Sequence, residues 1–509
     1  MAHPESSAPP ARAGRRQWAA LGVLVLVVVL LTVDGTVLYL AVPSMTVDLE
    51  PTASQLLWIG DIYSFALAGL LITMGNLADR IGRKKLLLIG SAAFGVASVL
   101  AAFAPSAEML IAARALLGIA GATLMPSTLS LVRAMFVDAK QRTKAIAIWS
   151  MGATAGAALG PLVGGVLLEH FWWGSVFLIN VPIMVIVLVA GPILIPESRG
   201  DAKAPIDLLS SALSILSIIP LVFAIKHWVS SGFDLVVVGT ALIGLLAGWV
   251  FIRRQLRLAH PLLDLTLFRM PAFAGSVAAN GLAIFAFMGL LFFFSQYLQL
   301  VREFGPLLAG IAELPSTIAS MVVVLFIGFL VAWLGRGRSI GLGLALGGIG
   351  LAGIGLTITM PSYWGLGIFL AVVGLGVGVA MTLSTDAVVS SVPEARAGAA
   401  ASIAETAYEL GAALGIAVLG SVQLAIYRSN LALPVDTDAA TTKAVEESLA
   451  VAMATVDNTT VIEHAQHAFT VAVQTTSYVA AALLIVAAVV AWRVIPSPRG
   501  AESAVNVAH

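Results

Sequence analysis

The residues of this chain that can do chemistry are ionisable side chains placed inside long apolar stretches. A charge in hydrocarbon costs several kcal/mol unless it is paired, hydrated or neutralised, so each one asks for an explanation. Five acids lie in such stretches: Asp34, Asp61, Glu313, Glu405 and Glu409. Arg114 is the one base that we place inside a span, whereas Lys226 is assigned to the edge of a loop and Asp386 to a solvated span end.

One embedded base cannot pair with five acids, so we expect most of the acids to line a water-filled cavity. A carboxylate that is partly removed from water can hold and release a proton, and it also attracts cations. The alternative is that these carboxylates are hydrogen-bonded between helices for packing alone.

The elements that hold these acids must be membrane-spanning helices. Of the 509 residues, 59% are apolar and only 11% are charged, against about 25% charged residues in an average soluble domain. A helical span needs roughly 20 apolar residues, and we count fourteen such runs. The predicted fold class is an all-α polytopic membrane protein in which two helices are inserted between two sets of six.

Charged residues outside the spans predict the orientation. Of the 27 Lys and Arg residues, 22 fall on the side of the two termini. The opposite side holds only four, Lys226, Arg302, Arg428 and Lys443. Because basic loops stay in the cytoplasm, we expect both termini to be cytoplasmic.

Global features exclude several classes of function. The net charge of zero gives no electrostatic footprint for a nucleic acid, and the absence of cysteine excludes disulfides and thiolate metal sites. The sequence contains no phosphate-binding loop of the G-x-x-x-x-G-K-[ST] type and no metal-ligand motif. We expect no cofactor, no metal and no enzymatic activity.

An internal repeat relates the two sets of six spans. A single shift of the chain superposes Gly75 on Gly328, Leu77 on Leu330, Gly82 on Gly335 and Arg83 on Arg336. The second copy has Ala332-Trp333 where the first has Asp79-Arg80. We therefore predict that a charged gate in this loop exists on one side only.

Several motifs carry a resemblance to a known family. They are Gly75-Asn-Leu-Ala-Asp79-Arg80-Ile-Gly82-Arg83-Lys84-Lys85, Arg114-Ala-Leu-Leu-Gly118, Gly156-Ala-Ala-Leu-Gly160-Pro161-Leu-Val-Gly164-Gly165, Phe177-Leu-Ile-Asn180-Val-Pro182 and Pro261-Leu-Leu-Asp264. Together they resemble the major facilitator superfamily and, within it, the fourteen-span drug:H⁺ antiporters. The resemblance implies a major facilitator fold and covers about residues 17–495.

The site residues are divided by chemistry and by this resemblance. We assign proton coupling to Asp34, Arg114 and Glu409, and substrate binding to Asp61, Glu313, Glu405, Tyr39 and Tyr63. Glu405 and Glu409 are four residues apart on one helix face, so either can serve either task. Arg114 from the residue alone is as compatible with a structural counter-ion. The conformational motifs are Gly75, Asp79, Arg80, Gly82, Arg83, Gly156, Gly160, Pro161 and Gly164.

The predicted organisation has six parts. They are a disordered tail at 1–16, a six-helix bundle at 17–200, two inserted helices at 201–253, an amphipathic surface segment at 254–270, a second six-helix bundle at 271–495 and a tail at 496–509. The external loop at 429–466 contains a stretch, 440–454, that is either an amphipathic helix over the outer mouth or part of a mobile loop.

The predicted function is export of small lipophilic cations such as drugs, dyes and antiseptics in exchange for protons. The protein is expected to be a monomer in the lipid bilayer of a bacterial cytoplasmic membrane. The alternative is an exporter of an endogenous lipid or siderophore-like metabolite with the same fold.

Overall fold

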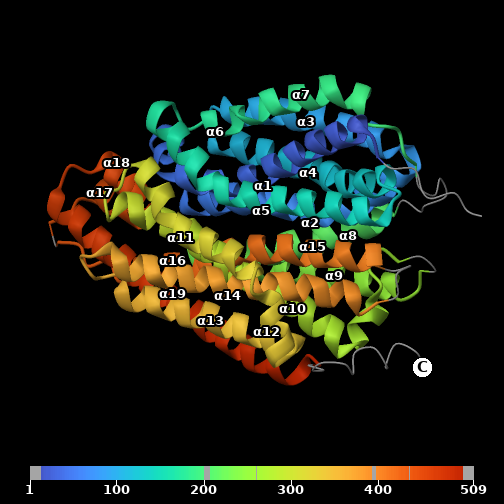
Figure 1. The fold of residues 1–509 in the computed structure, drawn as a ribbon. Coiled ribbons are helices and arrows are strands. Elements are labelled where there is room, and N and C mark those ends of the chain that lie inside the picture. Colours follow the sequence, from blue (N-terminus) through green and yellow to red (C-terminus); the bar gives the residue numbers. More distant parts are fainter. Residues whose placement is uncertain (1–12, 200–206, 259–260, 393–396, 435, 497–509) are drawn as a thin grey trace, which may run out of the picture.

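The computed structural model describes residues 13–199, 207–258, 261–392, 397–434 and 436–496. Within these ranges all regular secondary structure is helical, and the helices form two bundles, one above the other in Figure 1. Among the described residues, thirteen helices are long and apolar enough to cross a membrane, or fourteen if α5, which is bent, counts as one span. The expected class, an all-helical membrane protein, is confirmed.

The first bundle contains the helices drawn from blue to green in Figure 1. They are α1 (Arg15–Leu49), α2 (Ala53–Ile81), α3 (Arg83–Ala102), α4 (Ala107–Met135), α5 (Ala139–His170), α6 (Ser175–Leu178) and α7 (Asn180–Leu194). The short α6 and α7 together make one span.

The second bundle contains the helices drawn from yellow to red, preceded by α10. They are α10 (Pro271–Leu300), α11 (Pro306–Val324), α12 (Ile327–Leu334), α13 (Arg336–Thr357), α14 (Tyr363–Ser390), α15 (Ala397–Leu414), the π-helical η3 (Gly415–Leu419), α16 (Gly420–Ser429) and α19 (Thr459–Val494). The helices α15, η3 and α16 follow one another without a break, and α11 and α12 are separated by Leu325 and Phe326.

The two bundles repeat the same packing. In the first, α1 packs on α5 and α7, α2 on α4, and α3 on α4 and α7. In the second, α10 packs on α15 and α19, α11 on α14, and α13 on α14 and α19. The repeat also extends to the backbone, because Gly82 and Gly335 both end a helix with positive φ, at 114° and 79°. A left-handed turn of this kind favours glycine.

The two ends of the molecule are named here by what lies at them. The terminal side holds Arg15 and Arg493, and the loop side holds the segment 430–458 with the short helices α17 (Ala439–Glu447) and α18 (Leu449–Thr455). These two helices replace the single one considered at 440–454, and α19 begins inside the expected loop at Thr459.

The bundles meet along two seams. At the α5–α11 seam, Gly165 lies against Pro306 and Leu307, and Gly310 lies against the carbonyl of Pro161. At the α2–α15 seam, α2 contacts α15 and η3. Side chains larger than hydrogen would separate the backbones at both glycines, so the α5–α11 seam depends on them.

The inserted helices are α8 (Leu208–Ser231) and α9 (Leu235–Gln255). They pack on each other, and α8 also contacts α2, η3 and α16. Much of the apolar surface of α9 is exposed, including Leu235, Leu245 and Leu246. This hairpin therefore lies outside the two bundles, with α8 over the α2–α15 seam.

A capped ion pair closes the hairpin at the terminal side. Asp207 caps α8 through the Ser210 N–H, and its carboxylate lies 2.9 Å from Arg254. Burial alone would raise the pKa of Asp207, but hydrogen bonds from Ser210 and Arg254 outweigh it and leave the pKa below its usual value. Charge-assisted bonds of this kind stabilise the ionised carboxylate.

The surface segment expected at 254–270 is not a helix as a whole. Its first two residues, Arg254 and Gln255, end α9, and in the rest of its described part only η1 (Leu265–Arg269) is helical. This element is a 3₁₀-helix that Asp264 caps. Pro261 explains the difference, because a proline cannot supply the backbone N–H that a continuous helix needs.

Candidate functional site

A buried charge cluster lies where α1, α2, α4 and α7 meet. The Arg114 Nη1 of α4 is 3.2 Å from the Asp34 Oδ2 of α1, and both side chains are at most 1% exposed. The other carboxylate oxygen of Asp34 accepts a hydrogen bond of 2.7 Å from the Asn180 Nδ2 of α7. Arg114 also donates from Nε to the Ile59 carbonyl, and its guanidinium lies 4.8 Å from the centre of the Tyr63 ring.

The local sequence of α4 brings these groups together. Gly118, one turn after Arg114, lies against the backbone carbonyl of Tyr63, where an added Cβ would clash. Gly121 faces the Tyr63 hydroxyl, and a Cβ at position 121 would lie only 3.2 Å from that oxygen. The spacing of Arg114 and these glycines therefore lets α2 approach α4 closely enough for Tyr63 to cover the guanidinium.

Asp61 belongs to a second charge pair, and this corrects the placement of Lys226. The Lys226 Nζ lies 2.7 Å from Asp61 Oδ2, and the two side chains are 1% and 0% exposed. The ammonium also lies 3.8 Å from the centre of the Trp58 ring. Lys226 is thus a buried residue of α8 rather than a loop residue, and Arg114 is not the only embedded base.

The span prediction for α8 was too short, which explains the error. Assigning Lys226 to the edge of a loop implies a span that ends at this residue, whereas the helix continues through His227 and Trp228 to Ser231. A run of fewer than about 20 residues is short for a span. Extending it by one turn would have placed Lys226 inside.

Three glutamates of the second bundle form no salt bridge in the described ranges. Glu313 on α11 is 3% exposed, and Ser295 of α10 lies beside it. Glu409 on α15 is 8% exposed and faces Ser64 of α2 across the α2–α15 seam. Glu405, one turn earlier, is half-buried.

The expectation that most of the embedded acids lack a basic partner holds in the second bundle and not in the first. Asp34 and Asp61, in the first bundle, are each paired with a base. Glu313, Glu405 and Glu409, in the second, carry no basic partner among the described residues. A lone buried carboxylate is costly when ionised, so these three are the groups that gain most from a proton or a bound cation.

Tyr39 stands between the two bundles. Its hydroxyl donates to the Met288 Sδ of α10 at 3.6 Å, and its ring meets Phe292 edge to face at 5.8 Å. It lies within electrostatic reach of Arg114, Asp61, Glu313 and Glu409. The structure therefore brings Tyr39 close to the embedded acids, as it does Tyr63 to Arg114.

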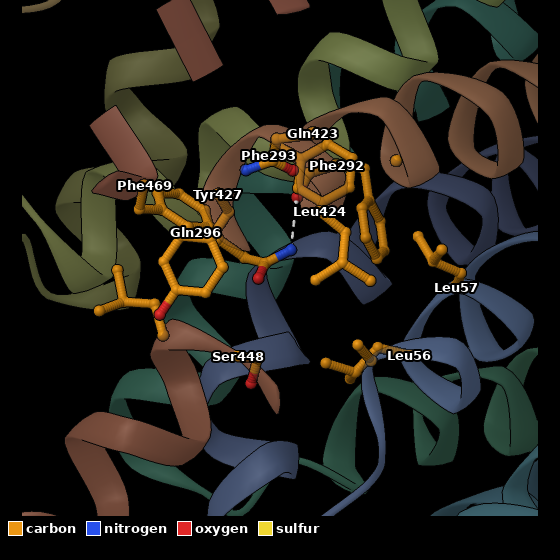
Figure 2. Close-up of a pocket in the computed structure, with 13 residues that line it drawn as sticks. Leu56, Leu57, Phe292, Phe293, Gln296, Gln423, Leu424, Tyr427, Ser448 and Phe469 are labelled. Carbon is orange, nitrogen blue, oxygen red and sulfur yellow. Dashed lines mark hydrogen bonds between the residues drawn. The ribbon is translucent and has the colours of Figure 1, made fainter. Parts of the chain in front are cut away.

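A pocket lies next to the pair of Tyr39 and Phe292, on the loop side of the molecule (Figure 2). Its walls come from α2, α10, α16, α18 and α19, and its lining includes Leu57, Phe292, Gln296, Gln423 and Tyr427. Phe292 also packs against Tyr39 and against Gly60, which precedes Asp61, so it connects the pocket to the embedded acids. The helices α17 and α18 lie over this end, tied down by hydrogen bonds of Ala53 N–H to Glu447 and of the Tyr427 hydroxyl to Val445.

The glycine stripe of α5 is a packing face toward α1. A Cβ on Gly156 would lie 2.6 Å from the Val29 carbonyl and would clash with Thr32 Oγ1. Gly160 meets Thr36 and Gly164 meets Val37 in the same register. Pro161 lies at a bend of 42° between the segments that end at Ala157 and begin at Leu159. A proline removes a backbone hydrogen bond and thereby permits such a bend.

The motif from Gly75 to Arg83 covers the end of α2, the turn at Gly82 and the start of α3, and Arg83 makes polar contacts inside the first bundle. Arg83 lies 2.7 Å from Asp79 and also donates to the Ser130 carbonyl of α4 and to Ser198 after α7. In the second copy, Arg336 pairs with Asp386 of α14 at 3.0 Å, and Asp386 is exposed as expected. The aspartate missing at position 332 is thus replaced by one from a neighbouring helix.

Sequence reasoning gave no role to Lys226, Trp58, Ser64 or Asn180. Asn180 stood within a quoted motif, so a signal was present. Trp58 and Ser64 lie three residues on either side of Asp61. Trp58 is an aromatic residue in the outer half of a span, but tryptophans near a membrane interface are ordinary and gave it no role. Within the described ranges, no group of three or more His, Asp or Glu residues is placed to hold a metal ion.

Comparison with known proteins places this arrangement in context. Residues 24–416 match the sequence profile of the Major Facilitator Superfamily. The chain is 44% identical to the multidrug efflux pump LfrA of Mycolicibacterium smegmatis over 492 residues, covering 96% of this chain and 98% of LfrA. It is 37% identical to the methyl viologen resistance protein SmvA of Salmonella typhimurium, covering 83% and 86% of the two chains.

A solved structure shares the fold. The inward-facing, unoccupied structure of a bacterial homologue of the human lysosomal transporter Spinster aligns with a TM-score of 0.64 over 94% of this chain and 97% of that one. The two sequences are only 16% identical, so this similarity concerns the fold.

Proposed function

Since the chain belongs to the major facilitator superfamily, and its relatives are efflux and resistance proteins, we propose that it exports lipophilic cationic drugs, dyes and antiseptics in exchange for protons. It is a transporter and not an enzyme, and it spans the bacterial plasma membrane several times. The terminal side is the cytoplasmic side in this proposal, and the protein works as a monomer without a cofactor.

The observation that carries the proposal is the set of three buried or half-buried glutamates that have no basic partner in the described ranges. A site for an anionic substrate would need unpaired bases, but Arg114 and Lys226, the two buried bases in the described part of the chain, are paired with acids. Lone carboxylates beside aromatic rings suit a cation with a flat apolar body. Methyl viologen, in the name of SmvA, is a molecule of that class.

Proton coupling is assigned to Asp34, Arg114 and Glu409. A proton on Asp34 removes the charge that holds Arg114, and Glu409 is within electrostatic reach of the freed guanidinium. Proton binding at Asp34 thereby changes the charge available to a substrate at Glu409. Substrate binding is assigned to Asp61, Glu313, Glu405, Tyr39 and Tyr63.

The organisation proposed for this function follows the repeat. Residues 17–200 and 271–495 are the two bundles that rock about the site, and 201–253 is the inserted pair. The motif residues Gly75, Asp79, Arg80, Gly82 and Arg83, together with the α5 stripe, govern the movement rather than bind substrate.

Ethidium efflux from a pump-deficient strain is the direct test. We expect expression of the protein to speed efflux and a protonophore to abolish the effect, with proton uptake into substrate-exporting proteoliposomes as the second readout. If neither the protein nor the protonophore changes ethidium efflux, the proposal is wrong and an exporter of an endogenous lipid or siderophore-like metabolite takes its place.

A further inference from the structure

The pair formed by Lys226 and Asp61 has the composition of a cation-binding site that is already filled. The carboxylate of Asp61 lies on one side of the ammonium at 2.7 Å, and the ring of Trp58 lies on the other at 3.8 Å from its centre. A carboxylate and an aromatic face are the groups that recognise an organic cation. Here the cation belongs to the protein.

The bonding of this cation is incomplete. An ammonium has three donors, and a carboxylate accepts several hydrogen bonds. Apart from their ion pair, neither the Asp61 carboxylate nor the Lys226 ammonium has a hydrogen-bond partner among the described residues. A buried pair without such bonds gains little net free energy, because the loss of hydration offsets the attraction. Replacing the ammonium of Lys226 by another cation therefore costs little free energy at this position.

The position of Lys226 on its helix allows it to leave. It lies five residues before the end of α8 at Ser231, about 8 Å from the loop side at 1.5 Å per residue. A lysine side chain covers most of this distance and can turn its ammonium toward the surface while its methylene groups remain buried. The released charge thus need not stay in the membrane interior.

The surroundings of the pair connect it to the moving parts. Val222, one turn before Lys226, packs with Phe65 of α2 and with Ala413 and Ala417 of α15 and η3. The π-helical η3 interrupts an otherwise regular span at this contact, and such interruptions are frequent at functional sites. Movement of Lys226 would therefore change the packing of α8 at the α2–α15 seam.

We propose that Lys226 is a resident counter-cation, and that a transported lipophilic cation displaces it from Asp61 and Trp58. This rests on the proposed function, since it presumes that the substrate is a cation. It gives the inserted helix a task in transport: Lys226 sets the affinity that a substrate must exceed, and it restores the neutral site after the substrate has left.

Equilibrium binding of ethidium to the purified full-length protein tests the proposal, with fluorescence as the readout at mildly alkaline pH. Lys226→Met removes the competitor, so we expect ethidium to bind about tenfold tighter, equivalent to about 1.4 kcal/mol. Asp61→Asn and the double variant Asp61→Asn/Lys226→Met should lack this gain. Arg254→Met is the matched control, because it removes the ion pair with Asp207 at the opposite end of α8 from Lys226, and it should leave binding unchanged.

Two further comparisons keep the outcome decisive. If Lys226→Met does not fold, Lys226→Arg retains the charge; its guanidinium can bind a carboxylate with two hydrogen bonds, so ethidium should bind more weakly than to the wild type. Unchanged or weaker binding by Lys226→Met, or tighter binding by Lys226→Arg, overturns the proposal. Wild-type protein that exports ethidium while Lys226→Met shows no gain refutes only the role of Lys226, whereas wild-type protein that neither binds nor exports ethidium refutes the proposed function.

Discussion

At the scale of the residue, the first bundle pairs its embedded acids and the second does not. Asp34 has Arg114 and Asn180 as partners, and Asp61 has Lys226. Glu313 and Glu409 are buried without a base in the described ranges. The two kinds of acid should therefore respond differently to neutralisation, the first through lost pairing and the second through lost attraction for a cation.

The pair of Asp34 and Arg114 gives the first prediction. Arg114→Gln should destabilise the protein by about 3–5 kcal/mol, because it leaves a buried carboxylate without its counter-charge. The double variant Asp34→Asn/Arg114→Gln should recover much of this loss. Unfolding in detergent measures both, and a double variant as unstable as the single one would contradict the prediction.

Transport separates coupling from recognition. Asp34→Asn should abolish proton-driven efflux of every substrate, since it removes the group that links a proton to Arg114. Glu313→Gln, which leaves the Asp34 pair intact, should weaken export of some cations and spare others. Efflux of mono- and dications from proteoliposomes provides the comparison. Uniform loss at Glu313 would show that it is not a specificity residue.

At the scale of the element, small side chains set the distances between helices. The stripe on α5 lets it contact the α1 backbone, and the site acid Asp34 lies on the same stretch of α1, between Thr32 and Thr36, which face Gly156 and Gly160. The packing of α5 thus positions Asp34 indirectly.

Gly156→Ala tests this dependence. The added methyl group meets Thr32 and the Val29 carbonyl, so we expect a loss of about 1–3 kcal/mol from overpacking. Gly35→Ala is the control on the same pair of helices, because nothing lies within 4 Å of its added Cβ. Gly35→Ala should be neutral or gain up to about 1 kcal/mol of helix propensity. Thermal unfolding of the two variants should differ accordingly, and equal stability would argue against the packing role.

The cap formed by α17 and α18 is an element whose attachment can be weakened. The Glu447 carboxylate accepts from the N–H of Ala53, the first residue of α2, at 2.6 Å. A negative charge at a helix N-terminus is worth about 0.3–1 kcal/mol. Loss of this contact should loosen the loop side.

Because the sequence contains no cysteine, one introduced cysteine can report how accessible the pocket is to a thiol reagent. Gln423→Cys places a single thiol in the pocket beneath the cap. With Glu447→Gln added, an impermeant thiol reagent applied from the loop side should label it severalfold faster. Thr455→Val, which removes a hydrogen bond within α18 itself, is the control and should not change the rate. No acceleration by Glu447→Gln would mean that the cap does not close this pocket.

At the scale of the whole molecule, much of the architecture followed from the sequence because hydrophobic runs and repeats are local signals. Run length alone predicted fourteen spans, and the described residues contain thirteen, or fourteen if the bent α5 is one span. The repeated glycines at Gly82 and Gly335 mark the same turn in both bundles. The resemblance to a known family grouped Asp34 and Arg114 by role, and the structure shows that they also form a pair.

The composition of the second charge pair could not be predicted in this way. Whether Lys226 faces water or Asp61 depends on how α8 is rotated and where it docks, and both are properties of tertiary packing. The same holds for Arg336 and Asp386, which lie 50 residues apart and are joined by α13 and α14. A search confined to one loop finds an aspartate missing there, whereas the fold supplies it from another helix.

The position of the inserted hairpin makes the two sides of the molecule unequal for a compound dissolved in the bilayer. Between such a compound and the α2–α15 seam stand α8 and α9, whereas no inserted helix of the described chain packs on the α5–α11 seam. A lipophilic molecule that diffuses in the plane of the membrane thus meets a covered flank and an uncovered one. The two bundles are related by a repeat, but the lipid-facing surfaces of their two seams are therefore not equivalent.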